Sequence, residues 1–578
     1  MCGIIGYVGE KEAYDILVKG LKRLEYRGYD SAGTAIVSGK KLNVNKVLGR
    51  VEKLGTDGKK FPGKLGIAHT RWATHGKPSV ENAHPHVGCQ GKIAIVHNGI
   101  IENYLEIKDR LRNHKFLSET DSEVVVHLIE ENYKGDLKEA VSNTIKELYG
   151  TYALCVVHAE KDEIIVARNG SPIVIGIGEK ENIIASDVSA IVEHTKKVIY
   201  LDDLEMAIVK KDSVKIFDKN GKKIEKEITA VDWDLTMAEK GGYKHFMLKE
   251  IMEQPDVVKN TLNVEIPDID IKNINRIFII ACGTAYYAGL VGKYILEKFA
   301  KVPVIIEAAS EFRYADPVIG KDDLFISVSQ SGETADTLAA LRLAKKKGAK
   351  TLGIINVMNS TIARESDQVI YTRAGIEIGV ASTKAYVSQL IILYLIAQKI
   401  AGKEIKGLKE LPLLVQKILD GNQIEAIAKK YFRVYNFLFI GRNLNYPTAL
   451  EGAMKLKETS YIHAEGYSAG EMKHGPIALV TDQVPTVAIA VKDSVYPKMV
   501  SNMQEVKARN GKIIAVATEG DKDIAKIADD IIYIPEVDEL LTPVLAVIPL
   551  QLLAYKIADM RDCDVDKPRN LAKSVTVE

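Results

Sequence analysis

The second half of the chain alternates apolar runs with helical segments, and this rhythm limits the fold more than any other sequence feature. After about residue 245 the apolar runs are 277–282, 302–306, 324–329 and 351–356, and after about residue 430 they are 437–442, 484–491 and 512–518. Strands that are apolar along their whole length and separated by helices predict parallel sheets covered on both faces.

The two sets of runs lie roughly 160 residues apart, about one domain length. Helices are expected at 334–347, 447–459 and 495–508. We interpret the recurrence as an internal duplication of an α/β domain. Two unrelated α/β domains would show a similar rhythm, so the pattern leaves that alternative open.

The first 220 residues have a different pattern, in which short β-rich runs are joined by polar turns. The run 152–157 turns back into 163–168 as a hairpin would. Helical patterns lie between such runs, at 12–24, 101–113, 121–133 and 136–148. Hairpin strands with separate helices predict a layered α+β domain.

The chain has 578 residues, which at roughly 150 residues per domain predicts two to four domains. The linker is expected where the sequence becomes polar and contains paired glycines. The predicted division is a first domain at 2–217, a linker at 218–245, α/β domains at 246–420 and 421–561, and a polar tail at 562–578.

Composition narrows the class of protein. Lys and Arg total 78 and Asp and Glu total 77, a balance that argues against a dedicated nucleic-acid or membrane-surface binder. The five cysteines include no C-x-x-C pair, as is usual in a reducing compartment. The most apolar windows, 385–401 and 540–555, are broken by polar residues and prolines. We expect a cytoplasmic enzyme with no nucleic-acid or membrane partner.

Cys2 directly follows the initiator methionine. If Met1 were removed, this residue would carry both a thiol, with an ordinary pKa of about 8.5, and a free amino group, with one of about 7.7–8.0. A nucleophile and a base would then share one residue. From Cys-Gly alone, a cysteine at position two by chance is the commoner explanation.

Three later segments strengthen the case for a site. Arg71 offers a planar donor for a carboxylate. Asn98 and Gly99 follow an apolar strand, and their N–H groups suit an oxyanion hole. Asp121 opens a helix and is either a cap or the partner of a substrate ammonium group.

Five motifs in this region, MCGIIGYVG, RLEYRGYDSAG, HTRWATHG, HNGIIEN and ETDSEV, resemble class II glutamine amidotransferases, which are N-terminal nucleophile hydrolases of αββα architecture. The resemblance covers about the first 215 residues. It implies that Cys2 attacks the glutamine amide to give a thioester and ammonia, and that Asn98 and Gly99 hold the oxyanion. The implied glutamine contacts are Arg71, Trp72, Thr74, His75, Gly76 and Asp121, with Trp72 also gating the ammonia path.

In the second half, hydroxyl groups gather where strands meet helices. Ser329, Ser331 and Thr334 surround a turn between a strand and a helix, and the unpaired N–H groups of the helix start favour an anion there. Thr284 and Ser382 lie at two further edges of this kind. Ligands of doubly wound sheets bind at the carboxyl ends of the strands, so this pattern suits a small phosphorylated polyol.

These motifs resemble the sugar isomerase (SIS) domain, here in two copies that follow the glutaminase domain. With 432–475 and the end of the chain, DKPRNLAKSVTVE, the whole chain resembles the glutamine–fructose-6-phosphate aminotransferase (isomerizing) family, also called the glucosamine-6-phosphate synthase family. The resemblance implies that L-glutamine and D-fructose 6-phosphate give L-glutamate and D-glucosamine 6-phosphate, with ammonia channelled between the sites, as the first step of hexosamine biosynthesis. It also implies a homodimer with no metal and no organic cofactor.

The resemblance also implies roles for residues in the second half. Glu458 would move a proton between C1 and C2 of the sugar, His474 would assist ring opening, and Lys573 would form a Schiff base with the ketose. Ala285 departs from the serine often found there. The implied sugar-phosphate contacts are Cys282, Gly283, Thr284, Ser329, Gln330, Ser331, Thr334, Val380, Ser382 and Lys455.

The sequence also allows other interpretations. His84 and His86 form a short pair without an evident third ligand, so no metal site is expected there. One rival function is a phosphosugar isomerase or deglycase that no longer uses glutamine, which the complete set of glutaminase residues disfavours. Another is a non-enzymatic sugar-phosphate sensor, which would need neither Cys2 nor Lys573.

Overall fold

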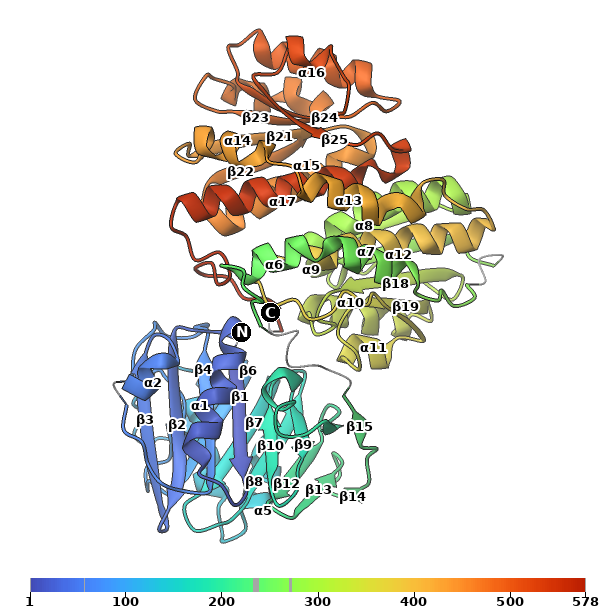
Figure 1. Ribbon diagram of the computed structural model, residues 1–578. Helices are drawn as coiled ribbons and strands as arrows, with labels where there is room; N and C mark the ends of the chain where they lie inside the picture. Colours follow the sequence, from blue (N-terminus) through green and yellow to red (C-terminus); the bar gives the residue numbers. More distant parts are fainter. Residues whose placement is uncertain (1, 57, 232–238, 270–272, 577–578) are drawn as a thin grey trace. The chain divides into compact units, whose positions relative to one another are not determined.

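The computed structural model describes residues 2–56, 58–231, 239–269 and 273–576 (Figure 1). The chain divides into two compact units: unit 1 is Met1–Met237 with Ser574–Glu578, and unit 2 is Ala238–Lys573. The boundary between them falls in the predicted linker, 218–245, of which 232–238 lies outside the described residues. The earlier part of that segment contributes two short strands to the sheets of unit 1.

Among the described residues, unit 1 has two sheets whose paired strands are antiparallel. The eight-stranded sheet has the order β15 (Thr229–Ala230), β11 (Lys197–Tyr200), β9 (Val174–Ile177), β10 (Asn182–Ala185), β1 (Gly3–Val8), β4 (Leu65–Arg71), β2 (Ser31–Ser38), β3 (Lys41–Leu48). The seven-stranded sheet has the order β14 (Lys223–Ile224), β13 (Ser213–Phe217), β12 (Met206–Lys210), β8 (Ile164–Asn169), β7 (Gly150–His158), β6 (Ile93–Ile101), β5 (His86–Val87).

Helices cover the outer faces of the two sheets, which gives the predicted αββα layers. Neighbouring residues of a strand point to opposite faces, so Ile5 packs with Leu17 of α1 (Ala13–Leu24), whereas Ile4 packs with Val96 between the sheets. On the other side, Ile95 packs beneath the helices of the second sheet. The other helices of unit 1 are α2 (Glu52–Thr56), α3 (Tyr104–Arg110), α4 (Glu123–Asn132) and α5 (Leu137–Ile145).

The predicted hairpin is confirmed, since Val157 of β7 pairs with Ile164 of β8. The helix expected at 101–113 is shorter than predicted and begins at Tyr104. The reason is that β6 continues to Ile101 by pairing with β7. This extension holds Asn98 and Gly99 in a sheet.

Unit 2 contains two parallel sheets of five strands among its described residues. The first has the order β17 (Val304–Ala308), β16 (Arg276–Ala281), β18 (Asp323–Ser329), β19 (Lys350–Ile355), β20 (Gln368–Tyr371). The second has the order β22 (His463–Ser468), β21 (Asn436–Gly441), β23 (Thr486–Ala490), β24 (Ile513–Thr518), β25 (Asp530–Ile534). In both sheets the strand order reverses at one point, between β16 and β18 in the first sheet and between β21 and β23 in the second. This is the order of a doubly wound fold. The identical order supports the predicted duplication.

The two α/β domains share one apolar core, because helices from both lie between the sheets (Figure 1). These helices are α8 (Gly283–Ala300), α12 (Lys384–Ala401), α15 (Tyr446–Ser460) and α17 (Thr542–Met560). The remaining helices of unit 2 are α6 (Phe246–Met252), α7 (Gln254–Leu262), α9 (Ala309–Phe312), α10 (Ala335–Lys346), α11 (Thr361–Glu365), α13 (Leu411–Leu419), α14 (Gln423–Tyr431) and α16 (Tyr496–Lys507).

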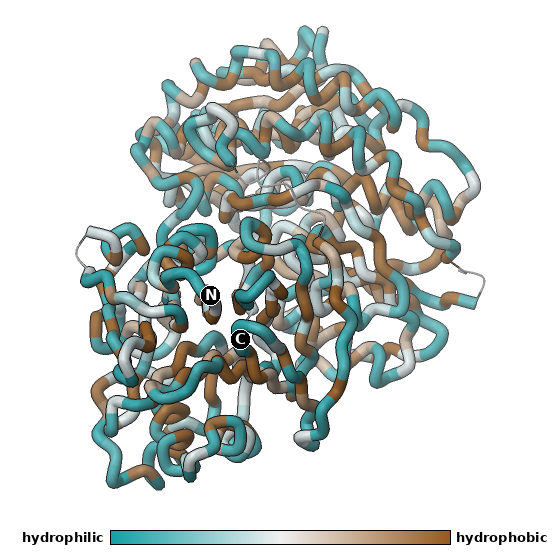
Figure 2. The backbone as a smooth tube through the Cα atoms, turned by 60° about the horizontal axis from the view of Figure 1, so that its bottom comes forward, coloured by the Kyte–Doolittle hydropathy of each residue, from teal (hydrophilic) through white to brown (hydrophobic). Residues whose placement is uncertain are grey.

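One helical segment of the described chain, Glu539–Met560, is long and apolar enough to cross a membrane by length and composition. However, 94% of its most apolar stretch is buried. In Figure 2, hydrophobic and hydrophilic stretches alternate along the coloured backbone. The segment therefore serves as the central core helix of unit 2.

Candidate active sites

The first candidate site surrounds Cys2, where β1 begins. Gly3 pairs with Thr70 of β4, so Cys2 lies beside the residues that follow this strand, and its Sγ accepts a hydrogen bond from the Trp72 N–H at 3.3 Å. Burial raises the pKa of the Cys2 thiol, while this hydrogen bond and the charge of Arg71 lower it. The pocket here is lined by Cys2, Arg71, Trp72, Thr74, His84, His97, Gly99, Thr120, Asp121 and Ser122.

Asn98 and Gly99, on β6 of the seven-stranded sheet, also lie at the Cys2 pocket. The Asn98 Nδ2 group donates to the Cys2 carbonyl at 3.1 Å and to Ser186 Oγ at 2.8 Å. An oxyanion could accept from Asn98 only by displacing one of these acceptors. Gly99 has a φ of +136°, and a Cβ there would lie 2.0 Å from the Thr151 carbonyl oxygen. This position therefore requires glycine.

Arg71 and Asp121, the predicted grips for the two ends of glutamine, both line the pocket. The buried Arg71 guanidinium donates to the carbonyls of His75 and Gly76, the latter at 2.9 Å. Asp121 accepts from the Ile101 N–H at 2.8 Å, and its Oδ1 lies 4.0 Å from His75 Nδ1. A substrate carboxylate would compete with the loop carbonyls for Arg71.

The structure adds residues that the sequence did not place in the glutamine pocket. His97 Nδ1 lies 2.8 Å from Ser122 Oγ, whose hydroxyl approaches Asp121 Oδ1 at 3.4 Å. Both residues belong to the motifs HNGIIEN and ETDSEV, which offered a signal for them. His84 is buried, and burial with neighbouring cationic groups lowers its pKa well below the usual range. It contributes a neutral ring to the pocket wall.

The second candidate site begins at the carboxyl end of β18. Ser329 Oγ accepts from the Gly332 N–H at 3.0 Å and lies 3.1 Å from Thr334 Oγ1. Ser331 Oγ accepts from the Glu333 N–H at 3.1 Å. Gly332 has a φ of +64°, and a Cβ there would lie 1.9 Å from Ser360 Oγ. The result is a compact turn that presents hydroxyl groups at the start of α10.

This turn lies at the switch point of the first parallel sheet, where doubly wound folds bind ligands. The neighbouring strand, β16, leads through Cys282 and Gly283 to Thr284 at the start of α8. The Cys282 Sγ lies 3.8 Å from Thr337 Oγ1 of α10. The predicted residues that follow β16 and β18 therefore occupy one edge of the sheet.

A charged group on α15 meets Thr284 from the second α/β domain. Lys455 Nζ donates to Thr284 Oγ1 at 3.0 Å and to Glu458 Oε2 at 2.7 Å, and it lies 3.4 Å from Glu451 Oε1. The side chains of Lys455 and Glu451 are 0% exposed and that of Glu458 is 21% exposed. This is a buried network and not an ion pair on the surface of a helix.

The charges of this network depend on burial. Burial raises the pKa of Glu451 to about 8, although Lys455 acts in the opposite direction. Burial also acts to lower the pKa of Lys455, but Glu451 and Glu458 outweigh it and raise that pKa. At neutral pH Lys455 is a cation, and Glu451 is largely protonated.

The tail of the chain folds back into unit 2. Lys573 Nζ forms an ion pair with Glu377 and donates to the Gly379 carbonyl at 2.8 Å. Glu377 also accepts from Ser382 Oγ at 2.8 Å. Before Lys573, the Asp566 carbonyl accepts from the Val380 N–H at 3.1 Å. Lys573, Val380 and Ser382 are thus brought together.

Glu377 was not identified from the sequence, and the structure places it between Lys573 and Ser382. Burial raises its pKa, but Lys573 and backbone N–H groups prevail and lower it to about 2. The charge of Glu377 is among those that raise the pKa of Lys455, so the two clusters lie within electrostatic range. By contrast, His474 ends a short helix, Ala469–His474, and is exposed, and its side chain makes no hydrogen bond or ion pair within the described part of the chain.

Comparison with known families matches both units. Residues 35–228 match the glutamine amidotransferase domain family. Residues 270–399 and 431–559 both match the SIS domain family. The second match spans the same two sheets that share a strand order, so the two α/β domains are two SIS domains.

Full-length relatives decide the family. Glutamine–fructose-6-phosphate aminotransferases (isomerizing) of Thermus thermophilus and Aquifex aeolicus are 51% and 52% identical to this chain, and that of Methanosarcina mazei is 49% identical. Each alignment covers 100% of both chains. The chain belongs to the glutamine–fructose-6-phosphate aminotransferase family.

Solved structures similar to this family member match its second half. The C-terminal domain of the glucosamine-fructose-6-phosphate aminotransferase from Francisella tularensis has a TM-score of 0.55 and 43% identity, and covers 57% of this chain and 99% of that one. Glucosamine-6-phosphate deaminase from Thermotoga maritima has a TM-score of 0.50 and 25% identity, and covers 58% of this chain and 100% of that one. Both structures thus correspond to the pair of SIS domains.

Proposed function

We propose that this protein transfers the amide nitrogen of L-glutamine to D-fructose 6-phosphate and isomerises the product to D-glucosamine 6-phosphate, releasing L-glutamate. The observation that carries the proposal is that one chain combines a Cys2 pocket with a buried cluster of Thr284, Lys455 and Glu458. A deglycase, an isomerase or a sensor would need only the second of these.

In the glutaminase half, the Cys2 thiolate attacks the amide carbon of glutamine. Removal of Met1, which lies outside the described residues, would give Cys2 a free amino group to take the thiol proton. That proton leaves with the amide nitrogen as ammonia, and water then hydrolyses the thioester to glutamate. Arg71 and Asp121 hold the α-carboxylate and α-ammonium groups, and Asn98 and Gly99 stabilise the oxyanion. Thr74, His75 and Gly76 complete the pocket.

In the isomerase half, the turn from Ser329 to Thr334 holds the sugar phosphate, and Lys573 forms an imine with the C2 carbonyl, releasing water. Ammonia, channelled from the first site, displaces Lys573 from C2. Glu458 then removes a proton from C1 and returns one to C2, which converts the ketimine into the 2-amino aldose. Lys455, 2.7 Å from Glu458, keeps that carboxylate positioned. His474 assists ring opening.

We further propose the domain division given above, a homodimer in the cytoplasm, and no nucleic-acid or membrane partner. The near balance of 78 basic and 77 acidic residues supports the last of these. The reaction moves a proton between neighbouring carbons without net oxidation, so the residues named suffice without an organic cofactor.

The test is to incubate the full-length protein with glutamine and fructose 6-phosphate and to measure glucosamine 6-phosphate and glutamate. Cys2→Ala should abolish glutamine-dependent synthesis, whereas Glu458→Gln should abolish synthesis and keep glutamine hydrolysis. Synthesis that survives in Cys2→Ala sinks the proposal. Trp72→Ala should release more glutamate than amino sugar, and a one-to-one ratio would remove its gating role.

A further inference from the structure

A group of potential metal ligands lies in unit 1 outside the glutamine pocket. We propose that the glutaminase domain binds one structural zinc ion through Cys89, His114, His127 and Glu130. One ligand atom from each of these residues lies within 4.8 Å of all the others. They belong to none of the motifs used above, and nothing in the proposed reaction employs them.

The separations fit a single tetrahedral ion. For metal–ligand distances of about 2.0–2.3 Å, atoms at the corners of a tetrahedron are about 3.3–3.8 Å apart. His127 Nδ1 lies 3.2 Å from His114 Nδ1 and 3.7 Å from Cys89 Sγ. Glu130 Oε2 lies 3.4 Å from His114 Nδ1 and 3.9 Å from His127 Nδ1. The four measured edges bracket the ideal values.

The ring orientations point to a metal more strongly than the distances do. Both histidines turn Nδ1 toward the shared centre and Nε2 toward a carboxylate. His114 Nε2 lies within hydrogen-bond distance of Glu131 Oε1, at 3.0 Å, whereas His127 Nε2 faces Glu123 Oε1 at 3.6 Å and makes no hydrogen bond. Histidine ligands of metals commonly donate their other ring N–H to a carboxylate, which fixes the tautomer and raises the basicity of the ligating nitrogen.

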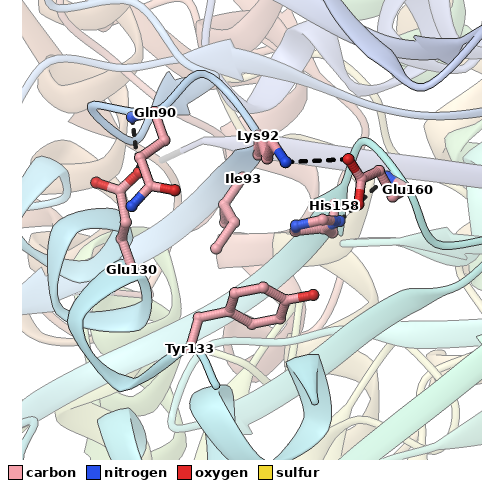
Figure 3. A pocket seen from close by; sticks show the side chains of 7 residues that line it. All are labelled: Gln90, Lys92, Ile93, Glu130, Tyr133, His158 and Glu160. Carbon is pink, nitrogen blue, oxygen red and sulfur yellow. Dashed lines mark hydrogen bonds and ion pairs between the residues drawn. The ribbon is translucent and has the colours of Figure 1, made fainter. Parts of the chain in front are cut away.

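The ligands come from three segments that the backbone already holds together. Cys89 lies in the turn between β5 and β6, His114 between α3 and α4, and the other two on α4. The N–H groups of Cys89 and Gln90 donate to the Glu130 carboxylate at 2.9 and 2.8 Å. Figure 3 shows Glu130 beside Gln90 at one end of a surface pocket. The site is therefore preorganised.

The ligand set selects zinc over calcium or magnesium. A thiolate and two imidazoles are soft and borderline ligands, whereas the other two ions need oxygen ligands. Four protein ligands fill a tetrahedron, which is the arrangement of structural zinc sites. Binding displaces the thiol proton of Cys89 to solvent. The ion would tie the segment before α4 to the β5–β6 turn, and that segment leads to Asp121 of the glutamine pocket.

The experiment titrates the chelator-stripped full-length protein with Zn²⁺ and, separately, with Co²⁺ as a spectroscopic probe. We expect one zinc per chain and, with Co²⁺, both tetrahedral d–d bands and a thiolate-to-cobalt charge-transfer band. Cys89→Ser should remove the charge-transfer band, and His114→Gln should weaken zinc binding by more than about 100-fold. Matched controls are Cys563→Ser and His463→Gln, which lie in unit 2 and should bind zinc as the parent protein does.

Cys89 is exposed, so Cys89→Ser should melt at the temperature of the metal-free parent, whereas the His114 side chain is only 10% exposed, so the melting temperature of His114→Gln is measured alongside its zinc binding. Should either fail to fold, the cobalt spectrum of the parent protein decides alone. Substoichiometric zinc in the parent, a cobalt spectrum without the thiolate band, or zinc binding unchanged in both variants would overturn the proposal. These readouts are independent of enzymatic activity, so the proposed function stands or falls separately.

Discussion

The two SIS domains have the same strand order, but the helix that follows the first strand buries apolar residues in one domain and ionisable residues in the other. Counted from the last residues of those strands, Ala281 and Gly441, equivalent positions hold Val291 and Ile295 on α8 but Glu451 and Lys455 on α15. All four side chains are buried. Buried polar and charged groups often stabilise a fold no more than apolar residues would, so stability alone does not explain why α15 carries Glu451 and Lys455 where α8 carries Val291 and Ile295.

The turn after the third strand also differs, and here the first domain carries more polar side chains than the second. In the first domain it carries the hydroxyl groups of Ser329, Ser331 and Thr334, whereas in the second domain β23 is followed by Val491–Val495, where Ser494 is the one hydroxyl-bearing residue. The duplication therefore repeats the fold, whereas the candidate site residues differ between the two copies. Under the proposed function, the first domain supplies the phosphate cradle, 329–334, and the second supplies the acid–base helix, α15.

The largest expected effect comes from the acid–base helix. Glu458→Gln should lower kcat for glucosamine 6-phosphate synthesis by about 10²–10⁴-fold, because the proton shift loses its base. Glutamine hydrolysis by the same protein is the internal control. Synthesis within threefold of the parent would remove Glu458 from the mechanism.

A second test gives α15 the apolar residues that α8 has at the equivalent positions and measures the effect on stability. Lys455→Met should lower the free energy of unfolding by about 3 kcal/mol, because it leaves the Glu458 carboxylate without its cation and the buried Glu451 carboxyl group without its polar partner. The double change Glu451→Val and Lys455→Ile should recover most of this loss in urea denaturation while synthesis stays abolished. Lys293→Met on α8, whose side chain is 34% exposed, is the matched control and should cost less than about 1 kcal/mol. A double variant less stable than Lys455→Met would contradict the account.

A change in the phosphate cradle, 329–334, should weaken the binding of fructose 6-phosphate and leave the rate of proton transfer unchanged. Thr334→Ala should raise KM for fructose 6-phosphate about tenfold with kcat nearly unchanged, since a hydrogen bond to a charged group contributes about 1.5–3 kcal/mol. Ser494→Ala, in the corresponding turn of the second domain, should leave both constants unchanged. Equal effects of the two changes would show that the cradle is not confined to one domain.

The last expected effect is on the pH dependence of stability, and it is spread over several pH units. The folded protein holds the Glu451 proton up to a pKa of about 8, well above the usual value of 4.5. It therefore binds more protons than the unfolded chain between these pH values, so stability falls as pH rises through this window, by at most about 1.4 kcal/mol per unit. Glu451→Gln should flatten this fall in urea midpoints measured from pH ~5 to ~8. An unchanged slope would show that Glu451 is ionised.

The sequence predicted the layers and the duplicated rhythm because periodicity reports directly on which faces are buried. It missed Glu451, although the spacing of Glu451, Lys455 and Glu458 places them on one helix face and offered a signal. It missed Glu377 because the partner, Lys573, approaches only when the tail folds back. It could not find Cys89 with His127, since their meeting depends on how a turn packs against α4.

The most direct test of the divided site is calorimetric titration of fructose 6-phosphate into the Glu458→Gln and Thr334→Ala proteins. The account predicts a Kd for Glu458→Gln within about threefold of the parent and a Kd for Thr334→Ala about tenfold weaker. Equal loss of binding in both proteins, or a loss only in Glu458→Gln, would contradict the assignment of phosphate to one domain and proton transfer to the other.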